Sequence, residues 1–224
     1  MRRFSSISKD PDLPGISRYD PQASNSTQSN GIQLNPRGLV PTLHFQAEGV
    51  DEYLVESGLI VEFLTGLYPS HLTPHGGNPV ADAAQRWRQR FFTDTWFGKV
   101  NPLLFKMTGT SDEAARLSIA NDITEQIGKE IEPLLANAGP YFGGSSVITV
   151  VEAMTMPFVI LMYDFCDDVV WPSILLEKAK AFPAFGKWIE VGMKHGSVLY
   201  RVARERRKEA VLNMLPQVRQ KYAP

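Results

Sequence analysis

The chain has 224 residues, of which 43% are hydrophobic, 21% charged and 10% aromatic, a composition typical of globular proteins. Its 23 Lys and Arg residues against 24 Asp and Glu residues leave a net charge of -1, so no broad basic field attracts nucleic acid or anionic lipid. These figures exclude disorder along the whole chain, and they do not identify a partner.

Residues 1–31 are rich in Ser, Asn, Gln, Asp and Pro, and their isolated apolar residues follow neither a strand nor a helix period. Such a segment buries too little surface to offset the entropy of ordering its backbone. It also lacks the apolar block of a signal peptide, and no run of 18 apolar residues occurs anywhere in the chain. We therefore predict a disordered tail over residues 1–31 in a cytoplasmic protein.

Residues 32–69 have the pattern of a small α/β unit. Residues 42–45 alternate polar with apolar, residues 48–51 have turn chemistry, and residues 52–55 form a second short strand pattern. Apolar residues then recur at helical spacing until Tyr68 and Pro69. The predicted order is strand, strand, helix.

A linker rich in Pro, Gly and His covers residues 69–79, and the rest of the chain, residues 80–224, is predicted to be an all-helical domain. An apolar stripe through Trp87 and Phe91 is resumed by Trp96 and Val100 after a slip, and Pro133 predicts a bend. The third helix is apolar almost all round, which is typical of a central buried helix. The predicted helices are residues 80–107, 112–138, 149–165, 173–180, 184–195 and 197–215.

Few residues suggest metal or thiol chemistry. Cys166 is the one cysteine, so no internal disulfide or CxxC motif exists, and we interpret it as a small buried hydrophobe rather than a nucleophile. His71 and His75 stand four apart, but Pro74 between them prevents a helix from presenting both to a metal. We therefore predict no metal site.

Two motifs at the ends of the predicted hairpin could bind a ligand. A cis bond between Val40 and Pro41 would turn the backbone of Val40 outward, where an extended peptide could pair with it. The alternative is a trans proline at the start of a strand. Ser57 stands directly before a helix, where its hydroxyl and the first free N–H groups could bind a carboxylate. The alternative is that Ser57 is only the N-cap.

Together these motifs resemble the second half of the glutathione-binding domain of glutathione transferases, and residues 38–41 are most similar to the omega class and its fungal relatives. In that family, the residue before the cis-proline pairs with the cysteinyl backbone of glutathione, and a Glu-Ser pair holds its γ-glutamyl end. The resemblance therefore implies a glutathione site at Val40, Pro41, Glu56 and Ser57. It is carried by Asn35-Pro36-x-Gly38-x-Val40-Pro41-x-Leu43 and by Leu54-Val55-Glu56-Ser57-x-x-Ile60-x-x-Phe63-Leu64.

The helical half supports this resemblance. Thr149 and Glu152 have the spacing of a capping box, similar to the Ser/Thr-x-x-Asp box that opens the family's central helix. The resemblance covers about residues 32–200. It implies an α+β protein with a partial thioredoxin-like N-terminal unit followed by an all-helical glutathione transferase C-terminal domain.

The N-terminal half of the family pattern is incomplete. A complete transferase begins with a strand, a helix and a strand, and its glutathione-activating residue lies near the end of the first strand. Here only residues 1–31 precede the matching region, so no residue is assigned that role. We expect a truncated or mis-spliced chain, or a divergent member that has lost catalysis.

The resemblance implies a homodimeric glutathione transferase that acts in detoxification. Such an enzyme conjugates glutathione, its co-substrate, to an apolar electrophile. Phe92, Trp96 and Tyr200 are the candidate substrate contacts, although aromatic residues at helical spacing are more often core. One alternative is a non-catalytic binding or scaffold protein with the same fold. Another, an omega-type thiol transferase or reductase, needs a cysteine at a position that Cys166 does not occupy.

The cations near the C-terminus are interpreted as a solvated helix face rather than a nucleic-acid site. They are Arg201, Arg204, Arg206, Arg207 and Lys208.

Overall fold

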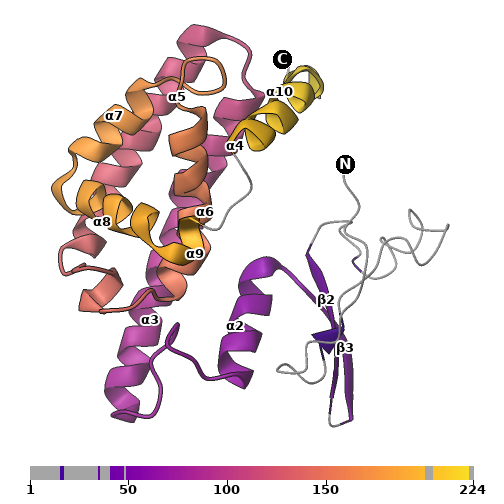
Figure 1. Cartoon of the computed structure of the whole chain (residues 1–224), viewed down its shortest axis with the longest axis vertical. Coiled ribbons are helices and arrows are strands. Elements are labelled where there is room, and N and C mark those ends of the chain that lie inside the picture. Colours follow the sequence, from indigo (N-terminus) through magenta and orange to yellow (C-terminus); the bar gives the residue numbers. More distant parts are fainter. Residues whose placement is uncertain (1–15, 18–34, 36–40, 48, 200–203, 222–224) are drawn as a thin grey trace. The chain divides into compact units, whose positions relative to one another are not determined.

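The computed structural model describes residues 16–17, 35, 41–47, 49–199 and 204–221. The chain divides into two compact units, Met1–Pro69 and Ser70–Pro224 (Figure 1). Among the described residues, the first unit contains the strands and one helix, and the elements of the second unit are helices.

The sheet of the N-terminal unit has the strand order β1 (Ile16–Ser17), β2 (Thr42–Ala47) and β3 (Val50–Val55), and both pairings are antiparallel. The register runs from Thr42 opposite Val55 to Ala47 opposite Val50. Gly49 joins the strands with a φ of 84°, which glycine adopts without steric cost. The predicted hairpin is present, with a shorter turn than expected because Val50 and Asp51 belong to the strand.

Strand β1 differs from the sequence prediction, which placed residues 16 and 17 in a disordered tail. The two residues pair with Phe45 and His44 of β2. A strand of two residues has no periodicity to recognise, so only its pairing with β2 reveals it. The other residues of the predicted tail lie outside the described part of the chain.

Helix α2 (Ser57–Leu67) packs on the hairpin through aromatic and aliphatic side chains. The rings of Phe45 and Phe63 meet edge to face, with centroids 4.9 Å apart. Phe45 and Ile60 are buried, while Tyr53, Leu59 and other large apolar residues remain exposed. The described part of this unit therefore has a small apolar core.

The C-terminal unit consists of helices packed around one core (Figure 1). The α-helices alternate with short π-helical and 3-10 segments, labelled η. In chain order they are α3 (Pro79–Thr95), η1 (Trp96–Val100), α4 (Asn101–Gly109), α5 (Glu113–Gln126), η2 (Ile127–Ile131), η3 (Glu132–Leu135), η4 (Phe142–Gly144), α6 (Val150–Phe165), α7 (Ile174–Ala181), α8 (Pro183–Lys194), α9 (Gly196–Leu199) and α10 (Arg204–Lys221).

The slip in the apolar stripe of the first long helix coincides with the π-helical segment η1. A π-helical turn holds an extra residue, which rotates the following side chains around the helix axis. Trp96 and Val100 are fully buried as a result. The prediction that the apolar stripe through Trp87 and Phe91 marks the core side of the helix is wrong. The buried residues on the core side are Phe92 and the polar Gln89.

The predicted capping box is confirmed at the start of α6. The Glu152 carboxylate is 2% exposed and accepts the N–H of Thr149 at 2.8 Å and its hydroxyl at 2.7 Å. Its other oxygen accepts the N–H of Phe142 at 2.8 Å and the Nε1–H of Trp188 at 2.6 Å. One buried carboxylate therefore joins η4, α6 and α8.

The residues predicted as a linker contact the helical unit. The N–H of Val150 donates to the carbonyl oxygen of Leu72 at 2.9 Å, and Arg86 donates to the carbonyl oxygen of Pro74 at 2.8 Å. The segment from residue 70 onward accordingly belongs to the second unit.

Two of the C-terminal cations correct the prediction of a solvated face. Arg207 pairs with the buried Asp164, with 2.8 Å between Arg207 Nε and a carboxylate oxygen, and Lys208 pairs with Asp167. Arg206 is exposed, as predicted. Pairing across elements that lie more than forty residues apart leaves no local signal in the sequence.

None of the helices in the described residues combines the length and the apolar character needed to cross a membrane.

Candidate functional site

The register of the hairpin brings the two predicted binding motifs to one end of the N-terminal unit. Thr42, the first residue of β2, lies opposite Val55, the last residue of β3. Pro41 precedes β2 and Glu56 follows β3, so both lie at this end. Pro41 and Ser57 are exposed there. Val40 lies outside the described residues, and the cis form of the bond between Val40 and Pro41 stays a prediction.

Glu56 has a backbone conformation that is rare for a side chain of its size. Its φ is 67° and its ψ is 110°, and it is the N-cap of α2. The carbonyl oxygen of Glu56 accepts the N–H of Ile60 at 3.0 Å. Residues held at positive φ cost free energy and cluster at ligand sites. Ser57 is therefore the first helical residue, and the alternative that it serves only as the N-cap is wrong.

The start of α2 suits an anionic ligand group. The first N–H groups of a helix have no partner within the helix, and the helix dipole adds a partial positive charge there. The first turn of α2 contains no acidic residue to neutralise it, and Ser57 supplies an exposed hydroxyl. The site could accept a carboxylate.

The helical unit buries two of the three predicted substrate contacts. Phe92 packs edge to face with Phe142 and Trp188, at centroid distances of 5.2 and 5.6 Å, and Trp96 stacks with Phe185 at 6.2 Å. Phe92 and Trp96 are fully buried within the helical core. A wholly enclosed side chain offers no surface to a ligand, so these two residues are core, which the sequence left as the alternative. Tyr200 lies outside the described residues.

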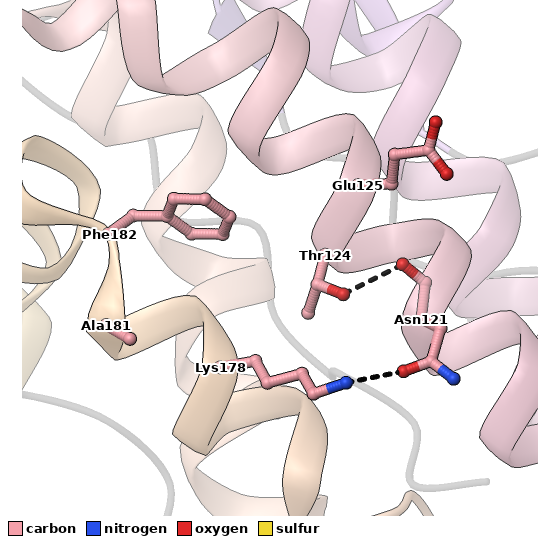
Figure 2. Close-up of a pocket in the computed structure, with 6 residues that line it drawn as sticks. All are labelled: Asn121, Thr124, Glu125, Lys178, Ala181 and Phe182. Carbon is pink, nitrogen blue, oxygen red and sulfur yellow. Dashed lines mark hydrogen bonds between the residues drawn. The ribbon is translucent and has the colours of Figure 1, made fainter.

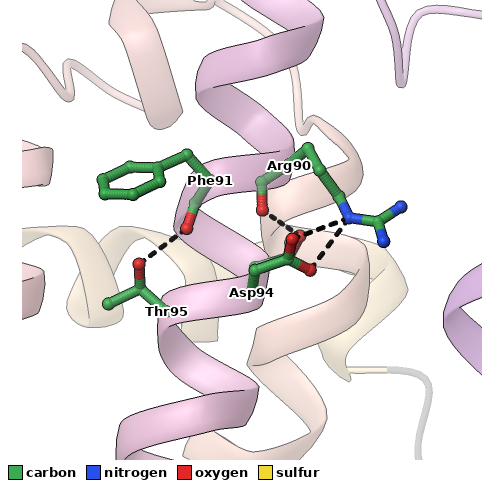
Figure 3. A network of polar contacts seen from close by, with 5 residues as sticks. Arg90, Phe91, Asp94 and Thr95 are labelled. Atoms are coloured by element: carbon green, nitrogen blue, oxygen red, sulfur yellow. Dashed lines mark hydrogen bonds and ion pairs between the residues drawn. The ribbon is translucent and has the colours of Figure 1, made fainter.

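The exposed aromatic residues of the same helix are Trp87 and Phe91, which are 65% and 47% exposed. Their rings are stacked, with centroids 5.4 Å apart. Figure 3 shows Phe91 on α3 beside Thr95, whose hydroxyl donates to the carbonyl oxygen of Phe91 at 2.7 Å. The spacing of four between Trp87 and Phe91 predicts that both lie on one face of the helix, but it does not predict whether that face is exposed or buried.

A polar pair lies next to Phe91 on α3. Arg90 Nε donates to the Asp94 carboxylate at 2.9 Å, as Figure 3 shows. Both side chains are about half exposed or more, so this pair contributes little to stability. In Figure 3 the pair lies on the other side of α3 from the Phe91 ring.

Cys166 is not a nucleophile in this structure. Burial raises the pKa of its thiol to about 12, and the side chain packs against the helical core. The thiolate is the reactive form of cysteine, so a thiol with this pKa is inert near neutral pH. This finding agrees with the interpretation of Cys166 as a small hydrophobe.

A shallow surface pocket of about 530 Å³ lies between α5 and α7 (Figure 2). On one side Lys178 Nζ donates to Asn121 Oδ1 at 2.8 Å, and Phe182 and Ala181 provide apolar surface. None of the predicted site residues lines it. Within the described ranges, no group of three or more His, Cys, Asp or Glu residues could hold a metal ion.

Comparisons with known proteins give a consistent result. No protein-family model matches the chain. Glutathione S-transferase omega-1 from the pig, Sus scrofa, is 29% identical over 128 residues, which are 57% of this chain and 48% of the pig protein. The match thus spans about half the length of this curated relative.

Two solved structures share the fold. Glutathione transferase Omega 1C from Trametes versicolor superposes with a TM-score of 0.65 at 18% identity, over 88% of this chain and 84% of its own. The chain is therefore similar in sequence to a glutathione transferase of the omega class, and it shares the glutathione transferase fold. Rice glutathione transferase GST1, solved in complex with glutathione, also gives a TM-score of 0.65 at 18% identity, over 86% of this chain and 80% of the rice protein.

The predicted fold class is confirmed for this glutathione transferase-like chain. It has a partial thioredoxin-like N-terminal unit followed by an all-helical glutathione transferase domain. Glutathione as a ligand of this chain, and the residues that would contact it, are part of the proposal below.

Proposed function

We propose that the end of the hairpin at Pro41, together with the start of α2, binds glutathione. The observation that carries this proposal is the register that pairs Thr42 with Val55 and so brings Pro41 and Ser57 to one end of the unit. Glutathione is an extended tripeptide with a free carboxylate at its γ-glutamyl end. It needs a backbone edge and an anion-accepting group close together, and in this proposal Val40 supplies the first and the start of α2 the second.

In this proposal each residue has one task. The backbone of Val40 pairs with the cysteinyl residue of glutathione, as in the addition of a β-strand. The hydroxyl of Ser57 and the free N–H groups of α2 accept the γ-glutamyl carboxylate. Glu56 supplies the opposite charge for the neighbouring ammonium group. The positive φ of Glu56 fixes the direction in which the chain enters the helix and so sets this arrangement.

The proposed activity is the conjugation of glutathione to an apolar electrophile. The thiolate of glutathione attacks an electrophilic carbon, a carbon–sulfur bond forms, and the leaving group departs with its electron pair while the thiol proton passes to solvent. Phe92 and Trp96 are buried in the helical core, so they do not contact the electrophile, and the residues that would contact it are not assigned. The residue that lowers the pKa of the glutathione thiol remains unassigned.

The second candidate is a binding or scaffold protein that keeps the glutathione site without turnover. The inert Cys166 favours this over a thiol transferase, which would need a reactive cysteine. The homodimeric state and the cytoplasmic location implied by the family resemblance remain predictions.

Retention on immobilised glutathione, followed by turnover of chlorodinitrobenzene, tests both candidates. Ser57→Ala should weaken retention about tenfold, the effect of losing one hydrogen bond to a charged group. Ser118→Ala is the matched control, because Ser118 is also an exposed serine of a helix, but its helix, α5, is not part of the proposed site. Retention without turnover would favour the binding protein. Absence of both would contradict the glutathione site.

A further inference from the structure

The pocket between α5 and α7 takes no part in the proposed function (Figure 2). The two helices pack against each other, and the pocket lies on the outer side of this contact. Its volume of about 530 Å³ falls within the range of about 300–1,000 Å³ that is usual for small-molecule sites. The side chains that line it carry two opposite charges and an aromatic ring.

The positive charge belongs to Lys178 of α7, which is exposed. Its Nζ donates to Asn121 Oδ1 of α5 at 2.8 Å, as Figure 2 shows. Among the described residues Lys178 forms no ion pair, so the partner that holds it at the pocket is a neutral amide. An ammonium group has three N–H donors, so Lys178 keeps donors for an anionic group of a ligand.

The negative charge belongs to Glu125, which stands one turn after Asn121 on the same face of α5. Glu125 is exposed, and within the described part of the chain it forms no ion pair. In Figure 2 its carboxylate points away from Lys178. Opposite charges that line one pocket without pairing can bind the two charged groups of one ligand.

A second acceptor lies beside Glu125. Thr124 is buried, and its hydroxyl donates to the carbonyl oxygen of Asn121 at 2.8 Å. A hydroxyl that donates one hydrogen bond still has lone pairs that accept others. Thr124 and Glu125 together therefore suit a ligand group that only donates, such as an ammonium group.

The apolar side of the pocket is formed by Phe182 and Ala181, at the end of α7. The Phe182 ring lies over Gly128, where an added Cβ would come within 2.7 Å of the ring. Glycine at this position therefore leaves room for the ring. Aromatic rings pack on one another edge to face or in offset stacks, so a ligand ring can pack on Phe182.

We propose that this pocket binds the zwitterion of a free α-amino acid with an aromatic side chain. The ligand carboxylate accepts from Lys178, the ligand ammonium group donates to Glu125 and Thr124, and the ligand ring packs on Phe182. A purely apolar ligand would leave both charges of the pocket without a partner, and a simple anion would meet the like charge of Glu125. The pocket shares no residue with the proposed glutathione site.

Titration of the isotope-labelled full chain with L-phenylalanine, followed by amide NMR signals, tests this proposal. The signals of Thr124, Glu125 and Ala181 should shift with one Kd, while that of Val159 in the helical core stays in place. The pocket is open to solvent, so the expected Kd is on the order of millimolar. Absence of shifts at the pocket residues up to the solubility limit of phenylalanine would overturn the proposal.

Analogues that lack one of the charged groups test the zwitterion. Phenylethylamine lacks the carboxylate and 3-phenylpropionate lacks the ammonium group. Each should bind about tenfold more weakly than L-phenylalanine, the effect of losing one charge-assisted hydrogen bond. Equal affinity for phenylalanine and both analogues would overturn the proposal.

Glu125→Gln should change the affinities for two ligands in opposite directions. The Kd for L-phenylalanine should rise about tenfold, because the ammonium group loses its charged partner. The Kd for 3-phenylpropionate should fall, because the repulsion between two carboxylates is removed. Glu113→Gln is the matched control, since Glu113 is an exposed residue of the same helix outside the pocket. Parallel changes for both ligands in Glu125→Gln would overturn the proposal.

The other two sides of the pocket are tested in the same way. Lys178→Met keeps most of the hydrocarbon stem and should raise the Kd for phenylalanine about tenfold, whereas Lys187→Met, at an exposed position of α8, should not change it. Ala181→Trp should fill the apolar side and prevent binding without lowering Tm, because Ala181 is exposed. Unchanged affinity in Lys178→Met and Ala181→Trp would overturn the proposal.

Discussion

At the scale of single residues, acidic side chains of this chain differ in their burial and in the number of hydrogen bonds that they accept. Glu152 is buried and accepts four hydrogen bonds, whereas Asp51 lies on the exposed face of the hairpin and accepts two. The Glu152 carboxylate connects η4, α6 and α8. The hydrogen bonds of Asp51 come from His44 and Gln46 within the hairpin. Substitutions at the two positions should therefore have different effects.

Glu152→Ala should lower the free energy of unfolding by about 3–5 kcal/mol, because buried donors such as Trp188 Nε1–H would lose their charged acceptor. Glu113→Ala, at an exposed position in the first turn of α5, should cost less than about 1 kcal/mol. Urea unfolding measures both values. Equal losses in the two variants would contradict the role assigned to Glu152.

The hydrogen bonds from His44 and Gln46 lower the pKa of Asp51. A carboxyl with a lowered pKa in the folded state stabilises the fold above its usual pKa and loses this contribution as pH falls through the folded value. NMR titration of the Asp51 carboxyl should give a midpoint below the usual one, and His44→Ala should raise it. An unchanged midpoint in His44→Ala would show that the 2.6 Å contact does not form in solution.

At the scale of elements, the close approach of α7 and α8 depends on a glycine, Gly186. Gly186 lies in the first turn of α8, where an added Cβ would overlap the carbonyl oxygen of Lys180 at the end of α7. Backbone cannot move aside as a flexible side chain can. The short connection between α7 and α8 therefore requires glycine at this position.

Gly186→Ala should lower the free energy of unfolding by about 1–3 kcal/mol, the range for overpacking a core. Gly98→Ala is the control, because no atom lies within 4 Å of its added Cβ and alanine favours helix over glycine. This control should raise the free energy of unfolding by up to about 1 kcal/mol. A destabilised Gly98→Ala with an unaffected Gly186→Ala would contradict the packing described here.

Local patterns predicted the elements that depend on local chemistry. The hairpin, α2 and the capping box of α6 follow from turn residues, periodicity and the spacing of Thr149 and Glu152. The sequence placed Pro41 and Ser57 at the two ends of the hairpin segment, and the antiparallel register of the structure brings them to one end of the unit.

Features that depend on tertiary contacts could not be predicted from the sequence. The outward position of Trp87 could not be predicted, because polar residues such as Gln89 fill the core side of α3. The pairing of Arg207 with Asp164 joins distant parts of the chain. Strand β1 exists only through its pairing with β2.

At the scale of the whole molecule, the two units differ in how much apolar surface they bury. The large connected core extends from Phe92 to Leu215 within the helical unit. In the described part of the first unit the buried apolar side chains are Phe45 and Ile60. Local stability follows the density of buried contacts, so the hairpin should open more readily than the helices.

Hydrogen exchange should show this difference directly. Amides of α6 should exchange only through the least frequent openings of the chain, whereas those of β2 and β3 should exchange faster. Glutathione should slow exchange in the hairpin and at the start of α2, since a ligand that binds the folded state stabilises it. Equal protection of α6 and β3 without ligand would contradict this account of the two units.

The most direct test of the glutathione site is a titration of the isotope-labelled chain with glutathione, followed by amide NMR signals. The account predicts that the signals of Thr42, Ser57 and Gly58 shift together with one Kd, while that of Trp96 in the helical core stays in place. Unchanged signals at Ser57 and Gly58, at glutathione concentrations that shift signals elsewhere, would contradict it.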